Sequence, residues 1–328
     1  MRPVRYSQGF TLLELMIVAA IVGVFVSQMF MSLAMNAKAY SNLDQVVESQ
    51  QGLRAIADLL ERDIRHAGFM IPEGAAVCGV DNSAAPDILY VSDASAIDPD
   101  DDLASYDGVD LTSDPANVAS GAYALSSLIL EPSPPNRPAY DTDGNGTADS
   151  DFRVNAGVII VDAAEFQRGA ACGRITAISL GGSSITFTLV SGPLGTSTTT
   201  PNLVAVPAHE YRIGGNNQLF RNNLLLSGGV EDLQVAYFID ADGDWQVDAG
   251  EMRGDGTSAD FNAQGTDLRK VREIRINLVT RTRLADPDFN GTVQSTENRN
   301  AGGTNDGFRR RRYTGTMALR NVGSRFAP

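Results

Sequence analysis

The chain has 328 residues and a formal net charge of -14, with 20% charged and 43% hydrophobic residues. This length is sufficient for one large core or two, and the composition is that of a globular protein rather than a disordered one. The acidic balance excludes a general nucleic-acid binder, because such proteins need basic surface to displace counterions from phosphates.

The first predicted element is a long apolar helix near the N-terminus. From Leu15 to Met35 the sequence has no charged residue and no proline. At about 1.5 Å per residue this stretch spans roughly 30 Å, the thickness of a bilayer core. It is longer than the apolar core of a secretory signal peptide, and no small-residue cleavage site closes it. Because Arg2 and Arg5 precede it, the positive-inside rule predicts a single-pass helix with a cytoplasmic N-terminus.

Glu14 is unusual because it places a carboxylate just inside the apolar run. A charged group at mid-bilayer costs roughly 2.5–3.5 kcal/mol or more, so an ionisable residue there indicates a function that involves a partner. The alternative is a glutamate that snorkels to the membrane interface, which its position near the end of the run permits.

The ten residues from Gly9 to Val18, GFTLLELMIV, closely resemble the class III signal of type IV pilins and type II secretion pseudopilins. The resemblance implies cleavage after Gly9 by a prepilin peptidase and N-methylation of the new terminus, Phe10. It also implies that Glu14 pairs with the N-terminal amine of a neighbouring subunit during assembly. Two charges that are costly to leave unpaired in an apolar environment would neutralise each other and set the register between subunits.

An amphipathic helix is predicted to continue from the apolar one and to end near Gly68, the expected C-cap. Five apolar residues recur at helical spacing: Val46, Leu53, Ile56, Leu60 and Ile64. The pattern matches the stem of a pilin. The predicted organisation is therefore a leader peptide over 1–9, a transmembrane and filament-core helix over 10–39, an amphipathic stem over 40–68 and an extracytoplasmic head over 69–328.

The head is predicted to be rich in β-structure. Short β-like runs are separated by clusters of Gly, Pro, Asn and Asp. The runs are Ile88–Val91, Ser127–Leu130, Val158–Val161, Ile175–Leu180, Ser184–Val190, Leu233–Ile239, Val271–Thr280 and Tyr313–Leu319. The predicted fold class is α+β, in which the long N-terminal helix packs on an antiparallel sheet with long loops. The acidic run Asp98–Asp102 is interpreted as one of these solvated loops.

Three further segments resemble PilW-type minor pilins. Two lie near the C-terminus, Leu268–Thr282 and Arg309–Gly323, and the third, Glu61–Phe69, closes the stem. Residues from about 80 to 225 show no such resemblance. The head is also larger than the heads of major pilins and of most pseudopilins, which favours a pilus protein over a secretion protein.

Three acidic loops carry oxygen ligands at the spacing of a calcium-binding loop, in which donors at alternate positions and a final acid wrap a hard cation. The candidate ligands are Asp286, Asp288, Asn290 and Glu297 in one loop, Asp240, Asp242, Asp244, Asp248 and Glu251 in another, and Asp141, Asp143, Asn145 and Asp149 in the third. Trp245 replaces the turn glycine of the second loop. The ion would be a structural Ca²⁺. The alternative is that the Asp-Gly and Asn-Gly pairs only form tight turns.

Cys78 and Cys172, the only cysteines, are predicted to form a disulfide because the head is expected in the oxidising space outside the inner membrane. The alternative is a pair of buried free thiols.

No motif of an enzyme is present in the sequence. The two histidines, His66 and His209, lack the spaced partners of a zinc site, and no nucleophile elbow, phosphate loop or dinucleotide fingerprint occurs. The run Arg309–Arg312 could contact phosphate or a neighbouring subunit, but pairing within so acidic a chain is the favoured interpretation. The protein is therefore not expected to be an enzyme.

The expected function is that of a minor pilin of a type IV pilus, a structural subunit that helps to prime assembly near the tip. The expected partners are other minor and major pilins, bound through the N-terminal helix, the prepilin peptidase and the inner-membrane assembly platform; nucleic acid is not among them. The subunit would sit in the inner membrane with its head in the periplasm and then enter the pilus. The alternatives are a type II secretion pseudopilin and a tip adhesin with a ligand-binding head.

Overall fold

The computed structural model describes residues 11–69, 71–93, 96, 108–128, 150–246, 248, 250–257, 259–300, 302 and 306–323. The chain divides into two compact units, Met1–Glu48 and Ser49–Pro328. Helix α1 (Leu12–His66) is continuous over 55 residues and contributes to both units. Gly68, the predicted cap, follows its end with a φ of +77°.

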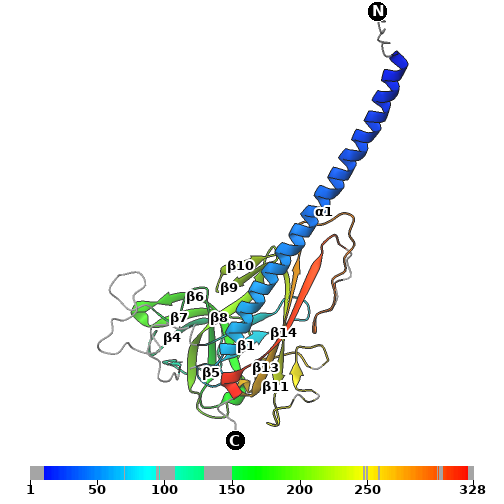
Figure 1. Ribbon diagram of the computed structural model, residues 1–328. Coiled ribbons are helices and arrows are strands. Elements are labelled where there is room, and N and C mark those ends of the chain that lie inside the picture. The colour runs from blue at the N-terminus through cyan, green and yellow to red at the C-terminus, as the bar shows by residue number, and fades with distance from the viewer. Residues whose placement is uncertain are drawn as a thin grey trace, which may run out of the picture. The chain divides into compact units, whose positions relative to one another are not determined.

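The second unit is built from strands that form two antiparallel sheets (Figure 1). The strands are β1 (Val77–Val80), β2 (Ile88–Val91), β3 (Val109–Asp110), β4 (Gly121–Ala124), β5 (Gly157–Asp162), β6 (Ala170–Ser179), β7 (Ser184–Leu189), β8 (Leu203–Gly214), β9 (Gln218–Arg221), β10 (Leu224–Gly228), β11 (Val230–Ile239), β12 (Met252–Arg253), β13 (Val271–Arg281) and β14 (Arg310–Ala318). Three 3-10 turns, η2 (Phe166–Arg168), η3 (Leu180–Gly182) and η4 (Leu268–Lys270), and the short helix α2 (Arg320–Gly323) complete the described elements.

The larger sheet has the order β1-β2-β8-β5-β6-β7-β4, with β3 and β9 also paired to β8 and β10 paired to β9. The smaller sheet has the order β12-β11-β13-β14. The α+β prediction is therefore confirmed. All predicted β-runs fall on strands except Ser127–Leu130, of which the described residues Ser127 and Leu128 are not in a strand. Leu128 is instead buried in a core as part of a loop.

Strand β8 is the centre of the larger sheet although Pro207 lies in its middle. Proline has no N–H to donate, so it normally weakens a central strand. Here the ladder between β2 and β8 ends at the pair Val91↔His209, and the carbonyl of Pro207 accepts a hydrogen bond of 2.6 Å from Ser92 Oγ. Because the β2–β8 ladder has already ended there, no carbonyl of β2 needs the backbone N–H that Pro207 lacks.

The two sheets share a core with the last turns of α1. Four residues of the predicted apolar stripe, Leu53, Ile56, Leu60 and Ile64, are buried there, whereas Val46 is half-buried. The four buried residues lie in one cluster with side chains from both sheets, among them Leu89, Tyr211 and Ile276. Strand β5 is buried on both faces, with Ile159 in this cluster and Ile160 in a second core that includes Phe152 and Phe187.

A disulfide joins Cys78 of β1 to Cys172 of β6, as predicted. In the strand order, β2, β8 and β5 lie between these two strands. In a flat sheet four strand spacings would separate them by roughly 19 Å. The two Cα atoms are 6.2 Å apart, so the sheet curves strongly and brings β1 close to β6. Both cysteines are fully buried in the core that α1 shares.

The first prediction concerns this crosslink. Because the bond closes a segment of 94 residues, its loss should lower the free energy of unfolding by roughly 4–5 kcal/mol in the chain-entropy account. Urea denaturation of the Cys78→Ala/Cys172→Ala variant, compared with the oxidised wild type, measures this change. Two free thiols per unfolded, unreduced wild-type chain would contradict the bond itself.

Asp87 is a buried carboxylate that connects the two sheets. Its backbone N–H donates to Leu233 O at 2.8 Å, and its side chain accepts from the N–H of Val235 at 2.7 Å and of Asn82 at 2.8 Å. Only 2% of the residue is exposed. Burial raises the pKa of Asp87 to about 8, against the lowering effect of the two backbone hydrogen bonds.

The second prediction follows from that shift. Between the ordinary value of 3.8 and about 8, the folded protein keeps a proton that the unfolded chain releases. The unfolded state then binds fewer protons, so stability should fall as pH rises, by up to about 1.4 kcal/mol per pH unit. Asp87→Asn should remove this part of the slope in urea titrations across the range, whereas the exposed Asp110→Asn should keep it. Equal slopes in the wild type and Asp87→Asn would contradict the assignment.

Candidate functional site: the N-terminal helix and the acidic loops

Thr11 and Glu14 form the N-terminal cap of α1. The N–H of Thr11 donates to Glu14 Oε2 at 3.0 Å, and the N–H of Glu14 donates to Thr11 Oγ1 at 3.2 Å. This reciprocal pair is a capping box, which satisfies donors that the first helical turn leaves open. Thr11 Oγ1 also donates to Glu14 Oε2 at 3.0 Å. Among the described residues, the Glu14 carboxylate has no cationic partner, so its charge is not compensated within this part of the subunit.

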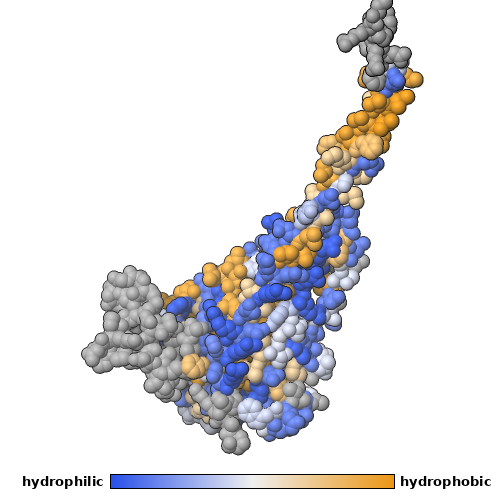
Figure 2. All heavy atoms as spheres, in the orientation of Figure 1, coloured by the Kyte–Doolittle hydropathy of each residue, from blue (hydrophilic) through white to orange (hydrophobic). Residues whose placement is uncertain are grey.

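The apolar side chains that follow Glu14 are exposed. Leu15 is 66% exposed and Met35 is 67% exposed, and the large apolar residues between them show the same pattern. By length and composition the helix can cross a membrane, and none of its most apolar window is buried. Figure 2 shows this half of α1 as a nearly continuous hydrophobic surface. The predicted cleavage residues Gly9 and Phe10 lie outside the described residues.

The Asp240–Glu251 loop gathers three of its five predicted ligands. One carboxylate oxygen each from Asp240, Asp242 and Asp244 lies within 4.8 Å of the others. Asp240 is buried, and its Oδ2 accepts from Arg272 Nε at 2.9 Å. Glu251 is turned to the backbone of the loop, where it accepts from the N–H of Ala241 at 2.8 Å and of Asp248 at 3.1 Å.

Two features of this loop bear on its match to the calcium pattern. Trp245 stands where the calcium pattern expects glycine, and its φ of +64° is in the left-handed region that glycine would favour. The guanidinium of Arg272 lies 4.1 Å from the centre of its ring. The pKa of Asp248 is raised, chiefly by the charge of Asp244, so like charges crowd one another in the loop.

The Asp286–Glu297 loop does not gather its predicted ligands. Among the described residues only Asp240, Asp242 and Asp244 form a group of three possible metal-ligating side chains. The two terminal acids are held by different arginines, because Arg309 Nη2 donates to Asp286 at 3.1 Å and Arg275 Nη2 donates to Glu297 at 2.6 Å. The predicted ligands of this loop therefore do not converge on one point. The third loop, with Asp141, Asp143, Asn145 and Asp149, lies outside the described residues.

Three of the four arginines in the run Arg309–Arg312 have partners within the chain, which agrees with the favoured interpretation for those three. Arg309 contacts Asp286, Arg310 contacts Glu231 and Asp306, and Arg312 donates to Thr296 Oγ1 at 2.7 Å. Neither histidine is part of a metal cluster among the described residues. His209 is buried and its Nδ1 lies 2.9 Å from Asn222 Nδ2, whereas His66 is exposed.

Sequence reasoning missed the polar anchor of the stem. Asp63 of α1 is buried, and its Oδ2 accepts from Tyr211 Oη at 2.5 Å and from Arg221 Nη2 at 2.7 Å. The pair fixes the end of α1 to strands β8 and β9. This anchor could have been predicted from the position of Asp63, an acid three residues after Leu60 and on the edge of the apolar stripe.

Two family models match the chain. Residues 193–321 match the family described as Type IV Pilus-assembly protein W, and residues 4–27 match the prokaryotic N-terminal methylation motif. No curated protein matches. Among solved structures, a type IV-like pilin from Thermus thermophilus aligns with a TM-score of 0.31 and 12% identity, covering 83% of this chain and 96% of the pilin chain. That likeness is too low to support an inference about function.

The methylation motif, the exposed apolar helix and the β-rich head define a type IV pilin-like subunit, anchored in a membrane and assembled into a filament. The segment from before β8 to α2 matches the PilW model and the N-terminus matches the methylation motif, and together these matches support a PilW-type minor pilin of a type IV pilus. As a pilin, the chain interacts with other pilins and is processed by a prepilin peptidase.

The third prediction concerns Glu14. Glu14→Gln keeps an acceptor for the Thr11 N–H but removes the charge, so membrane insertion should persist while incorporation into filaments falls by about tenfold or more. Glu14→Val should behave in the same way. Immunoblots of sheared filaments against membrane fractions measure the ratio. Ser27→Ala, which removes a local hydrogen bond in the same helix, is the matched control. Normal incorporation of Glu14→Gln would show that the residue acts only as a cap.

Proposed function

We propose that this minor pilin primes the assembly of a type IV pilus together with other minor pilins and takes a position near the tip. The observation that supports the proposal is the state of α1: its first half exposes apolar side chains, and Glu14 at their N-terminal end has no cation among the described residues. An uncompensated carboxylate in an apolar environment is costly and needs a partner. The amine of a neighbouring subunit supplies one.

The same features support a topology. Before assembly the apolar half of α1 spans the inner membrane, with residues 1–9 in the cytoplasm and the head in the periplasm. Cleavage after Gly9 by the peptidase leaves Phe10 as the methylated terminus, and the assembly platform then moves the helix into the filament. The role is structural, and we assign no catalytic residue to it.

Deletion of the gene tests the proposal when surface piliation and type II secretion are scored separately. The expected result is a loss of pili with normal secretion, restored by the wild type and not by Glu14→Gln. N-terminal mass spectrometry of the filament-borne protein should give a methylated Phe10. Normal piliation with a secretion defect would identify a pseudopilin instead, and retention of residues 1–9 in filaments would contradict the processing step.

We also propose that the loop formed by Asp240, Asp242 and Asp244 binds a structural Ca²⁺. Three carboxylate oxygens already converge, and two of the three residues are exposed to an incoming ion. Calcium coordinates such oxygens, and it would remove the repulsion that raises the pKa of Asp248. Glu251 would supply a further ligand if its carboxylate turned from the N–H groups of Ala241 and Asp248 toward the ion.

The fourth prediction tests this site by thermal denaturation. Calcium at about tenfold its Kd contributes about 1.4 kcal/mol, which for a head of this size raises the Tm by a few degrees relative to chelator. Asp242→Ala should reduce this gain, and magnesium should substitute poorly. Asp288→Ala is the control in the loop that does not gather its acids and should leave the gain unchanged. Identical melting with calcium and chelator would show that the acids only form turns.

A further inference from the structure

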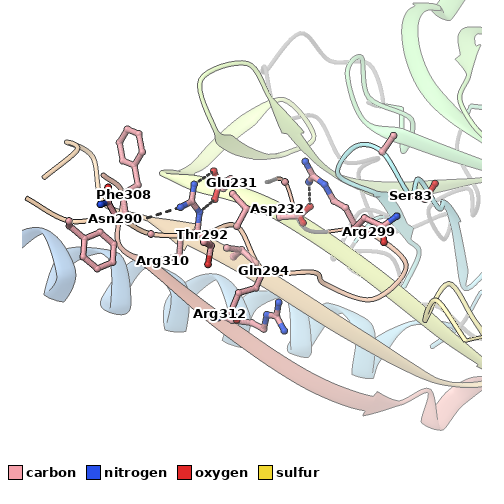
Figure 3. Close-up of a pocket in the computed structure, with 17 residues that line it drawn as sticks. Ser83, Glu231, Asp232, Asn290, Thr292, Gln294, Arg299, Phe308, Arg310 and Arg312 are labelled. Atoms are coloured by element: carbon pink, nitrogen blue, oxygen red, sulfur yellow. Dashed lines mark hydrogen bonds and ion pairs between the residues drawn. The ribbon is translucent and has the colours of Figure 1, made fainter. Parts of the chain in front are cut away.

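A cavity of about 550 Å³ lies over the smaller sheet, on the side of the loop that connects β13 to β14. That loop supplies most of the wall, the start of β11 and the beginning of β14 supply the floor, and the turn at Ser83 closes one end. In Figure 3 the labelled side chains extend from Phe308 and Asn290 at one end, past Glu231 and Asp232, to Ser83 at the other. The volume is within the range of small-molecule sites.

Two of the three arginines that line this cavity are paired with carboxylates. Arg310 donates to Glu231 Oε1 at 2.8 Å and to Asp306 Oδ2 at 2.6 Å. Arg299 donates to Asp232 Oδ1 at 2.5 Å. Arg312 donates to Thr296 Oγ1 and has no carboxylate partner among the described residues, so the lining holds three arginines and two carboxylates. A ligand that used its charge to bind Arg299, Arg310, Glu231 or Asp232 would have to break one of these pairs, and breaking a partly buried pair is costly.

The neutral polar side chains of the cavity, unlike the paired charged ones, have no partner within the described part of the protein. Asn290, Thr292, Gln294 and Asn300 project from the loop, and Ser83 from the opposite turn. Within the part of the chain that the structure describes, these side chains take part in no hydrogen bond to protein. Amides and hydroxyls each donate and accept, so together they offer both kinds of partner to one ligand.

Two aromatic rings complete the lining. Phe289 and Phe308 both border the cavity. One face of each ring is covered by a guanidinium, at 4.2 Å from Arg309 and at 4.1 Å from Arg281. The rings are therefore fixed in place and offer their remaining apolar surface to a ligand.

We propose that this cavity binds a neutral, hydroxyl-rich ligand, a short saccharide. Hydroxyl groups match the neutral donors and acceptors, and the C–H surface of a sugar ring matches the phenylalanine rings. The described part of the wall is anchored at two points, because Glu297 is bound by Arg275 and Asp286 by Arg309. These acids fit the calcium pattern in the sequence, but in the structure they anchor the wall of the cavity. The proposal adds a binding activity to the head and does not depend on its position in the pilus.

The test uses the full-length protein in a phosphocholine detergent, which carries no sugar headgroup. Saturation-transfer NMR and calorimetry measure binding of glucose, galactose, N-acetylglucosamine, lactose and cellobiose, with sialic acid and a tetra-alanine peptide for comparison. At least one neutral saccharide should bind. Asn290→Ala/Gln294→Ala should weaken that binding by about tenfold, because two hydrogen bonds are lost.

The control is Thr200→Ala/Asn202→Ala, a pair of exposed polar residues outside the cavity. Its affinity should equal that of the wild type, and circular dichroism should show that both variants keep the wild-type melting curve. The proposal is overturned if no neutral saccharide binds at about 10 mM. It is equally overturned if only sialic acid or the peptide binds, or if the cavity variant binds as tightly as the control.

Discussion

The organisation of this pilin depends on how the apolar side chains of α1 are covered. In the last turns the head covers them, and Leu60 and Ile64 are fully buried between its two sheets. Before Met35 the described part of the subunit covers none of them. Exposed apolar surface on this scale is unfavourable in water, so a membrane must hold the helix first and other helices afterwards. The roles of anchor and filament core follow from this one constraint.

The carboxylates of Asp63 and Glu14 lie in these two parts of α1, the part that the head covers and the part that it does not. Asp63 is buried in the head and is fully satisfied by Tyr211 and Arg221, so the stem is fixed to the strands within one subunit. Glu14 has only the neutral groups of Thr11 beside it among the described residues. A carboxylate that enters an apolar environment needs a cation, and under the proposed function the N-terminal amine of another subunit supplies it. The head is thus complete in itself, whereas the first half of α1 needs other subunits.

The sequence predicted those parts of the fold that local pattern determines. The long apolar run and the stripe from Leu53 to Ile64 both depend on spacing along the chain, and both were confirmed. Strand β8 was not predicted because Pro207 interrupts its pattern, and only the end of β2 beside it makes that proline harmless. The Asp286–Glu297 loop had the spacing of a calcium site, but Arg275 of β13 and Arg309, just before β14, bind its terminal acids. Such tertiary partners are not visible in a local pattern.

Thiol labelling of intact pili tests most directly whether the apolar half of α1 is buried between subunits. Because Cys78 and Cys172 are paired, Val22→Cys would carry the only free thiol of the chain. A bulky hydrophilic maleimide should fail to label Val22→Cys in intact filaments and should label it after dissociation in detergent, whereas Asn202→Cys on the head should be labelled in both states. Equal labelling of the two variants in intact filaments would contradict the account.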